Sequence, residues 1–465
     1  MLETLARANI GRLQTLYDHF PSPARNVLTS ARGWLLKRNR YSPETFSFLK
    51  ALRTHEGWTS EQIASFQLGA LRETVSRARA TVPYYAHYPQ VEIRSFDSLR
   101  LLPVVTRDTV RENREQFLSR DIPRRRRIFA GTTGTTGGSL RVAYTEELAR
   151  KNWAFLMQQW AWARVKPLQP RITMFGARVV PITSAKRPYW TYNLPERQFL
   201  LSIFHLSQHT AAEYINFMHA HQGAVLEGFP SVLSILANFA VEHGETIPMR
   251  VVFTSGEPLY PEAREKIASA FQTNLFDSYG MTEYCGLIQQ CERGEMHLAP
   301  EYGYLEILDE AGAAVFGDEE GYFVWTGFLN RAMPLVRYRI GDRGRWKLGS
   351  PCRCGRASPR VIPTITRESE ILHCPDGRIF SPRALNQFLK KATSLRFCQF
   401  IHDRPEHVIV RAVASNGRAS QEMMEIRGDL QELLGRAMRV TAEIATEPVI
   451  FPGGKIPLIV NRLSQ

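Results

Sequence analysis

The sequence predicts an α/β fold followed by a smaller α+β unit. Beyond about residue 170, short apolar runs suited to buried strands alternate with helical stretches, an order typical of α/β layering. The strand candidates are 172–175, 225–226 and 251–254. Ser231 is expected to cap a helix with one apolar face, made by Val232, Ile235, Leu236, Phe239 and Ala240. From about residue 367, strands over 397–401 and 407–413 and an amphipathic helix indicate the α+β unit, the helix carrying Met423, Ile426, Leu430 and Leu433.

The N-terminal region is expected to be mainly helical. Apolar residues recur there near helical spacing and the pattern stops at Pro83; they are Ile63, Phe66, Leu71, Val75 and Ala78. Apolar runs at 304–308 and 322–325 favour strands instead. We therefore expect a large unit over 1–366, with a helical lead-in over 1–100, and a small unit over 367–465.

Composition narrows the class of protein. Of 465 residues, 44% are hydrophobic and 22% charged, which is typical of a globular chain. The net charge of +14 suits ATP, coenzyme A, nucleic acid or an anionic membrane surface, or is simply a basic surface. No nucleic-acid-reading motif accompanies it, so we expect no specific nucleic-acid partner. The basic run 124–127 is either a solvated loop or a phosphate-steering element.

The chain shows neither a membrane-spanning nor a signal-peptide pattern. No stretch approaches the about 18 apolar residues that a span needs, and residues 1–7 lack a basic segment followed by an apolar one. Six cysteines are too few for a disulfide scaffold in a chain of this length. We therefore expect a cytoplasmic protein in a reducing compartment.

A Gly/Thr-rich loop over 131–138 could hold phosphate. Glycines let backbone N–H groups approach an anion, and threonine hydroxyls add donors. The spacing does not match a P-loop or a dinucleotide fingerprint. Taken alone, the loop is equally compatible with a flexible glycine-rich turn.

Four later motifs give this loop a context: 255–259 (SGEPL), 277–283 (DSYGMTE), 338–342 (YRIGD) and 452–455 (PGGK). An aromatic residue can cover a purine, and a hydroxyl beside a carboxylate can bind phosphate and Mg²⁺. An aspartate can accept from two ribose hydroxyls, and a lysine can stabilise charge on a transferring phosphate. Each motif alone is weak, but their order and spacing are specific.

With these motifs the chain resembles the adenylate-forming superfamily, most closely the branch of phenylacetate–CoA ligases and related capsular-polysaccharide-biosynthesis-type proteins. The resemblance covers about residues 70–465 and includes 79–85, 102–107, 333–342 and 352–356. It implies a large N-terminal adenylation domain and a small mobile α+β C-terminal domain. It also implies ATP-dependent conversion of a carboxylic acid to an acyl-adenylate, with Mg²⁺ as cofactor.

The resemblance implies a role for each matching residue. Phosphates of ATP would be held by Thr132, Thr133, Gly134, Thr135, Thr136 and Gly137. The adenine slot would be lined by Gly256, Glu257, Pro258, Asp277, Ser278 and Tyr279, with Asp342 on ribose and Arg367 at the hinge. The catalytic residues would be Thr282 at the α-phosphate, Glu283 on Mg²⁺ and Lys455 entering for adenylation. Gly228, Phe229 and His205 are candidate walls of the acid pocket, although His205 also suits a capping or core position.

The chain departs from the family pattern at two places. Ser139 and Leu140 stand where relatives usually have proline and lysine. The hinge segment 366–370 (TRESE) lacks the glycine and first aspartate of the usual element, which puts domain rotation in doubt. The turn 375–378 favours the capsular-type subgroup.

The acyl acceptor stays open. Coenzyme A is the family default, but a ligase forming an amide or ester without coenzyme A would keep every nucleotide motif, and a degenerate non-catalytic relative is a third alternative. The expected partners are thus a small carboxylic acid, ATP, an acceptor and, as a further alternative, a second copy in a homodimer.

Four residues form a second candidate site. Cys291 and His297, followed by Cys352 and Cys354, supply three thiolates and an imidazole, enough for a closed tetrahedral zinc site. Relatives often carry cysteine and histidine at these places. The alternative is a set of buried cysteines beside a surface histidine. With four protein ligands the zinc would be structural, because no position stays open for substrate.

Overall fold

The structure is a computed structural model of the whole chain. It describes residues 17, 19–131, 140–177, 179–181, 184, 186–206, 210–364, 372–376, 379–380, 385, 394–414, 418–451 and 456–463. The phosphate-loop candidates Thr132–Gly137, the hinge residue Arg367 and the lysine Lys455 lie outside the described residues.

Helices dominate the described N-terminal region. They are α3 (Ser22–Arg40), α4 (Pro43–His55), α5 (Ser60–Thr81), η1 (Pro83–His87), α6 (Phe96–Leu99), α7 (Arg107–Glu112), η2 (Arg114–Phe117) and η3 (Arg124–Arg126). Thr59 and Gln62 form a capping box that begins α5, and Pro83 begins the next element, as its sequence position predicted. In the basic run 124–127 the exposed residues Arg124–Arg126 form η3, and the half-buried Arg127 donates to the carbonyls of Ser119 and Ile122.

An eight-stranded sheet forms the centre of the large unit, in the order β11-β10-β9-β8-β7-β4-β6-β5. Its strands are β4 (Arg171–Met174), β5 (Trp190–Asn193), β6 (Gln198–Leu201), β7 (Val225–Gly228), β8 (Val251–Ser255), β9 (Leu275–Gly280), β10 (Leu287–Gln290) and β11 (Met296–Leu298). The five from β6 to β9 pair in parallel, and the outer pairs are antiparallel. The associated helices are α8 (Glu146–Trp162), η4 (Leu194–Glu196), α9 (Ala211–His219), α10 (Pro230–Glu242) and α11 (Pro261–Phe271).

A second sheet packs beside the first and has the order β1-β14-β13-β12, with β15 on β14. Its strands are β1 (Val105–Thr106), β12 (Gly303–Leu308), β13 (Gly321–Gly327), β14 (Tyr338–Trp346) and β15 (Val361–Pro363); β2 (Ile128–Gly131) and β3 (Arg141–Tyr144) form a separate hairpin. Arg337 enters β14 with φ 49° and makes a buried two-pronged pair with Glu306, at 2.9 and 3.0 Å. This pair fixes the start of the strand that carries Asp342.

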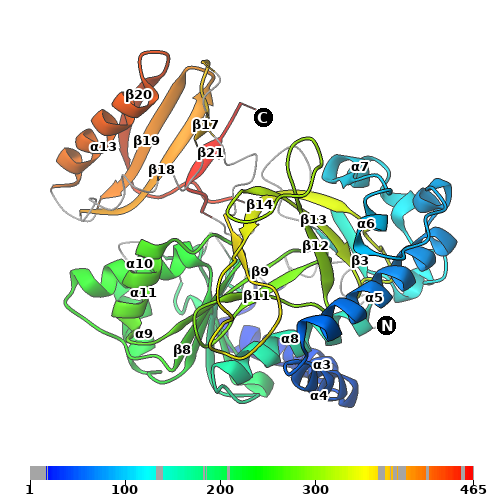
Figure 1. Cartoon of the computed structure of the whole chain (residues 1–465). Coiled ribbons are helices and arrows are strands. Elements are labelled where there is room, and N and C mark those ends of the chain that lie inside the picture. The colour runs from blue at the N-terminus through cyan, green and yellow to red at the C-terminus, as the bar shows by residue number, and fades with distance from the viewer. Residues whose placement is uncertain are drawn as a thin grey trace.

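The C-terminal part has its own apolar cluster, centred on Phe400, Val410 and Leu430. Its elements are β16 (Leu372–His373), β17 (Ile379–Phe380), β18 (Leu395–Arg404), β19 (His407–Ala414), α13 (Ala419–Leu434), β20 (Arg439–Ala445) and β21 (Ile459–Asn461). Four of these strands form a sheet in the order β20-β19-β18-β21, and α13 packs on it, above the large unit in Figure 1. Mixed α/β architecture is therefore confirmed.

One capping prediction is wrong. Helix α10 begins at Pro230, and Phe229 is its N-cap, so Ser231 lies inside the first turn. Proline suits the first helical position because its fixed φ matches the helix and its missing N–H would have no partner there. The N–H of Ser231 is bonded instead to the carboxylate of Glu257, at 3.1 Å.

No helix among the described residues combines the length and apolarity needed to cross a bilayer.

Candidate active site

Three of the predicted site segments lie on neighbouring parallel strands of the large sheet, at or near their carboxyl ends. Gly228 ends β7, Ser255 ends β8, and Asp277 lies in β9. The register pairs Gly228 with Thr254, and Thr254 with Asp277. Ligands of open α/β sheets bind at this edge. Motifs about 50 residues apart in sequence thus meet at a single site.

Phe229 lies directly against Gly256. A Cβ added to Gly256 would lie 3.1 Å from the Phe229 ring, and its φ of +80° also favours glycine. The ring of Phe175 meets Phe229 edge-on, with centroids 5.1 Å apart. A Cβ on Gly228 would lie 3.1 Å from the Met174 carbonyl oxygen. Glycine at 256 therefore allows the Phe229 ring to lie directly against the backbone that follows β8, two residues before the half-buried Pro258.

Asp277 is held inside the sheet. Its Oδ1 accepts a hydrogen bond from the Thr254 hydroxyl at 2.7 Å, and its N–H donates to Gln290 at 2.9 Å. Burial raises the pKa of Asp277 to about 6, partly opposed by the bond from Thr254 and the charge of Arg264. The neighbouring Ser278 is half-buried and donates to the Thr254 carbonyl.

Asp277→Asn is expected to flatten the pH dependence of stability. A raised carboxyl pKa means that the folded state holds its proton between about pH 4 and 6 while the unfolded state has lost it. Stability therefore falls as pH rises through that window, by about 3 kcal/mol at order-of-magnitude level. Denaturant midpoints at pH 5 and 8 should differ less in the asparagine variant than in wild type. Equal differences in both proteins would contradict the burial argument.

Two phenols hold two carboxylates where the sheets meet. The Tyr279 hydroxyl donates to Asp342 Oδ2 at 2.7 Å, and the Tyr338 hydroxyl donates to Glu283 Oε1 at 3.0 Å. Asp342 and Glu283 are each 3% exposed, whereas Thr282 is half-buried. Burial, and then the nearby charge of Glu283, raise the pKa of Tyr338, so this phenol stays protonated as a donor. The sequence motif contained Tyr338, but no role had been predicted for it.

Glu257 connects the two parts of the chain. One carboxylate oxygen accepts from the N–H of Ser231, and the other accepts from the N–H of Ile456, at 3.1 Å each. Ile456 directly follows Lys455 in sequence. The residue predicted to line the adenine slot therefore also fixes the C-terminal segment against the N-terminus of α10, a contact between positions 199 residues apart that no local pattern signals.

His205 is engaged by the protein at both ring nitrogens. Nδ1 lies 2.7 Å from the Ser202 hydroxyl, and Nε2 lies 3.1 Å from the Pro181 carbonyl oxygen. Its ring stacks on Tyr189 with centroids 4.9 Å apart. Burial lowers the pKa of His205, so the neutral ring is favoured. This geometry agrees better with the core position than with direct contact to the acid.

The Cys/His candidates come together. The ligand atoms of Cys291, His297, Cys352 and Cys354 all lie within 4.8 Å of one another. The sulfurs of Cys291 and Cys352 are 3.8 Å apart, and Cys354 Sγ lies 3.4 Å from His297 Nε2. Ligands about 2.3 Å from a tetrahedral zinc ion would be about 3.8 Å apart, so the donor set fits zinc. Ser358 accepts from the other His297 nitrogen, at 3.1 Å to its carbonyl oxygen, as an orienting group should.

This cluster joins two sheets. Cys291 and His297 lie in the β10–β11 hairpin of the large sheet, while Cys352 and Cys354 lie in the β14–β15 connection of the second. Glu292 instead pairs with Arg356 at 2.8 Å, and Cys285 is buried with its sulfur 3.1 Å from that of Met281. Neither is therefore part of the ligand set.

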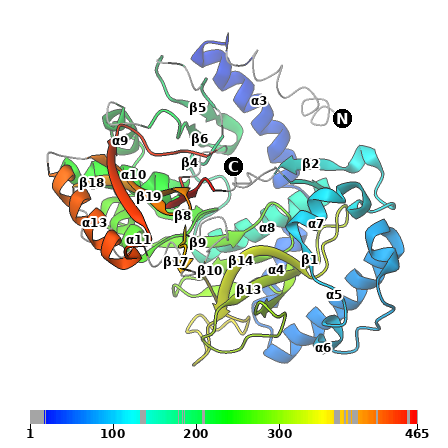
Figure 2. The ribbon, with the colours of Figure 1, turned by 90° about the horizontal axis from the view of Figure 1, so that it is seen from above.

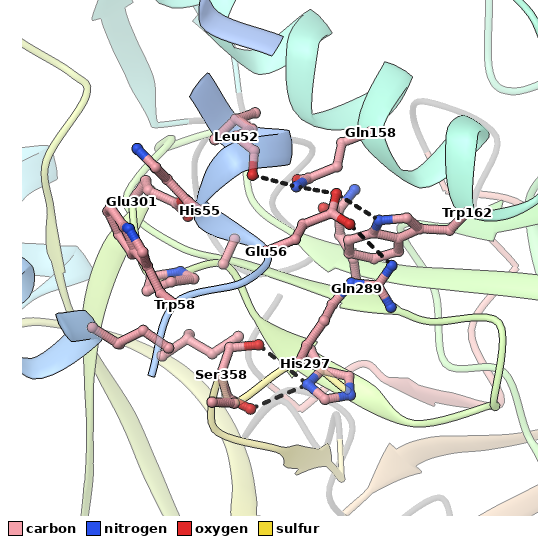
Figure 3. A pocket seen from close by; sticks show the side chains of 16 residues that line it. Leu52, His55, Glu56, Trp58, Gln158, Trp162, Gln289, His297, Glu301 and Ser358 are labelled. Atoms are coloured by element: carbon pink, nitrogen blue, oxygen red, sulfur yellow. Dashed lines mark hydrogen bonds and ion pairs between the residues drawn. The ribbon is translucent and has the colours of Figure 1, made fainter. Parts of the chain in front are cut away.

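A small cavity lies beside the cluster, between it and the end of α4 (Figure 3). Glu56 accepts there from Gln158 and Trp162, at 2.9 and 3.0 Å, and His297 and Ser358 lie at the opposite wall. Its volume of about 40 Å³ is room for about three water molecules. The cavity is too small for the substrate pocket and belongs to the surroundings of the Cys/His cluster.

No family model matches the chain, but comparisons with known proteins find relatives and similar folds. Protein CapK of Staphylococcus aureus is 23% identical over 97% of this chain and 100% of its own length. A phenylacetate-coenzyme A ligase of Thermus thermophilus is 23% identical, covering 67% of this chain and 72% of the relative. Among solved structures, 2-hydroxyisobutyryl-CoA ligase in its postadenylation state has a TM-score of 0.68 at 17% identity, covering 88% of this chain and 91% of that one. The same ligase in its thioesterification state has a TM-score of 0.54 at 18% identity, covering 88% of this chain and 91% of that one.

Proposed function

We propose that this chain, which belongs to the phenylacetate–CoA ligase-like branch of the adenylate-forming superfamily, joins a carboxylic acid to the α-phosphate of ATP and then passes the acyl group to coenzyme A. The observation that carries the proposal is the meeting of the Tyr279–Asp342 and Tyr338–Glu283 pairs beside the strand ends of β7, β8 and β9. In this proposal Asp342 would be the ribose acceptor and Glu283 the cation ligand, and their position beside the edge where such sheets bind nucleotides supports it.

The first half-reaction follows from the chemistry of these groups. Asp342, oriented by the Tyr279 hydroxyl, would accept from the ribose hydroxyls of ATP. Glu283 would hold Mg²⁺, which would neutralise charge on the phosphates, while Thr282 would donate to the α-phosphate. The acid's carboxylate oxygen would attack the α-phosphorus, forming an acyl-adenylate as pyrophosphate leaves. Phe229 with Gly228 would form the wall that directs the acid toward this phosphorus.

Coenzyme A is the acceptor that the relatives favour. The name of the Thermus relative includes coenzyme A, whereas the name of CapK, which aligns with 97% of this chain, includes no acceptor. The thiol sulfur would attack the acyl carbonyl and AMP would leave. An amine or hydroxyl acceptor uses the same adenylate and is the alternative.

Pyrophosphate exchange tests the first step. Purified protein should return labelled pyrophosphate to ATP only when a suitable acid is present, across a panel of aryl, fatty and hydroxy acids. The adenylate formed with the best acid is then offered coenzyme A, amines and alcohols, which identifies the acceptor. A protein that supports no exchange with any acid would favour the non-catalytic alternative.

Tyr279→Phe is expected to weaken ATP binding without abolishing catalysis. Without its hydroxyl, Asp342 loses the bond that orients it, a loss of about 1.5–3 kcal/mol for a bond to a charged group. The KM for ATP in pyrophosphate exchange should therefore rise about tenfold or more, with a smaller change in kcat. Tyr322→Phe is the matched control, because that phenol is bonded to Glu310 and not to Asp342. Equal effects of both substitutions would contradict the assignment.

We further propose that the cluster of Cys291, His297, Cys352 and Cys354 holds a structural zinc ion. The fit of its sulfur spacing to a tetrahedral site and the support of His297 by Ser358 favour this assignment. The ion would join the β10–β11 hairpin to the β14–β15 connection, and so hold together the sheets that carry Glu283 and Asp342.

A further inference from the structure

Helix α3 has its amphipathic faces reversed relative to an ordinary surface helix. Large apolar side chains point outward: Val27 is 68% exposed, Trp34 53%, Leu28 42% and Leu35 39%. Val27, Ala31, Trp34 and Arg38 follow one another at helical spacing, and Leu28 and Leu35 lie on the same side. A helix that only covered the protein core would bury this face.

The opposite, polar face binds the protein. Asn26 Oδ1 accepts from the N–H of Tyr192, and the Ser30 hydroxyl donates to the carbonyl of the same residue, at 2.9 and 3.1 Å. Gly33 lies so close to Asn193 that an added Cβ would overlap its side chain. Arg40 pairs with the buried Glu196 at 2.7 Å. These contacts with β5 and η4 fix α3 in an orientation that keeps its apolar face outward.

The charge of α3 indicates the kind of surface that its outer face would bind. Its sequence contains five basic residues, Arg25, Arg32, Lys37, Arg38 and Arg40, and no acidic one. Arg38 lies over the Trp34 ring, 5.1 Å from the centroid. Trp and Leu on one face with Lys and Arg beside them are typical of helices that lie in the headgroup region of a bilayer. The chain as a whole carries +14, which adds attraction to anionic lipid.

We propose that the outer face of α3 binds the surface of an anionic membrane, with Val27, Leu28, Trp34 and Leu35 entering the interface and the exposed Arg38 near the headgroups. The helix runs along the outside of the molecule beside β5 (Figure 2), and the C-terminal sheet lies at the other end of the large unit (Figure 1). A membrane on α3 would therefore leave the C-terminal part clear of the lipid. Such binding is peripheral and needs no membrane-spanning helix.

Vesicle flotation tests the proposal with the full chain. Wild type should float with vesicles in which about a third of the phosphatidylcholine is replaced by phosphatidylglycerol, stay unbound with pure phosphatidylcholine, and lose binding as salt shortens the range of electrostatic attraction. Trp34→Gln with Leu35→Gln should weaken binding at least about tenfold. Arg38→Gln should weaken it about fivefold, the effect of removing one charge near the surface.

Two further variants separate the face from general effects. Phe316→Gln with Leu348→Gln removes two apolar side chains that are 72% and 67% exposed elsewhere, and it should leave flotation unchanged. Trp34→Phe with Leu35→Met keeps the face apolar and should retain vesicle binding. Retained binding would show that substituting these two positions does not by itself disrupt the fold. The proposal is overturned if the wild-type protein does not float with anionic vesicles. It is likewise overturned if the Phe316→Gln/Leu348→Gln variant loses as much vesicle binding as the Trp34→Gln/Leu35→Gln variant. A third outcome would also overturn it: light scattering shows that wild type is a dimer and the Trp34→Gln/Leu35→Gln variant a monomer, while no variant floats with vesicles. The outer face of α3 would then bind a second copy of the chain.

Discussion

Lys455→Ala is expected to lower the rate of acid-dependent pyrophosphate exchange by about 10²–10³-fold, because a cation aimed at the transferring phosphate stabilises charge that develops only in the transition state. The segment that begins directly after this residue is already at the site, since the N–H of Ile456 is bonded to Glu257. The effect should therefore appear mainly in kcat, with little change in the KM for ATP.

Arg462→Ala is the matched control for this experiment. It removes an exposed cation from the same part of the chain, seven positions further on, and should leave exchange near the wild-type rate. A second readout uses acyl-adenylate supplied from outside. The Lys455→Ala variant should still transfer the acyl group of this adenylate to the acceptor. In that step the bond between the acyl carbon and AMP breaks, and no bond to phosphorus is made or broken. Unchanged exchange in Lys455→Ala would remove this lysine from the mechanism.

Removal of the zinc ligands is expected to have the largest effect on stability. Wild type should contain about one zinc ion per chain, and Cys352→Ser should contain almost none, because a serine hydroxyl is a poor replacement for a thiolate. At free zinc about a thousandfold above its Kd, losing the ion removes about 4 kcal/mol from the free energy of unfolding. Atomic emission on the purified protein and thermal unfolding with and without a chelator measure both quantities.

Cys285→Ala provides the comparison. This thiol is also buried, but it lies outside the cluster and contacts Met281. The substitution should preserve the zinc content even if packing changes lower the unfolding midpoint. If a chelator leaves the midpoint of wild type unchanged, or if Cys285→Ala loses as much zinc as Cys352→Ser, the structural-zinc assignment fails.

The hydrogen bond between Glu257 and Ile456 also bears on rotation of the C-terminal part about the predicted hinge. The segment 366–370 lies outside the described residues, so the effect of its missing glycine and aspartate on rotation stays a prediction. The N–H of Ile456, in the C-terminal part, is bonded to the carboxylate of Glu257 in the large unit. Rotation of the C-terminal part would have to break this hydrogen bond.

Local patterns in the sequence determined the fold class and most of the elements. Apolar spacing predicted the helix ending before Pro83 and the strands now seen as β4, β7 and β8, because burial of one side of an element imposes its own period on the sequence. The motif order likewise indicated an acid-activating family before any geometry was known. The cap of α10 was placed wrongly because Ser231 suits that position in general, whereas the preceding proline and the distant Glu257 decided the actual start.

Only the tertiary structure decided which of these residues meet. Tyr279 reaches Asp342 across 63 positions, and Cys291 reaches Cys352 across 61, because the strands and connections that carry them belong to two packed sheets. The sequence of α3 likewise did not show that its apolar face points away from the protein, because the same sequence would suit a helix that covers the core. Periodicity reports that a helix has two faces, but the hydrogen bonds to Tyr192 and the close approach of Gly33 to Asn193 determine which face the protein binds.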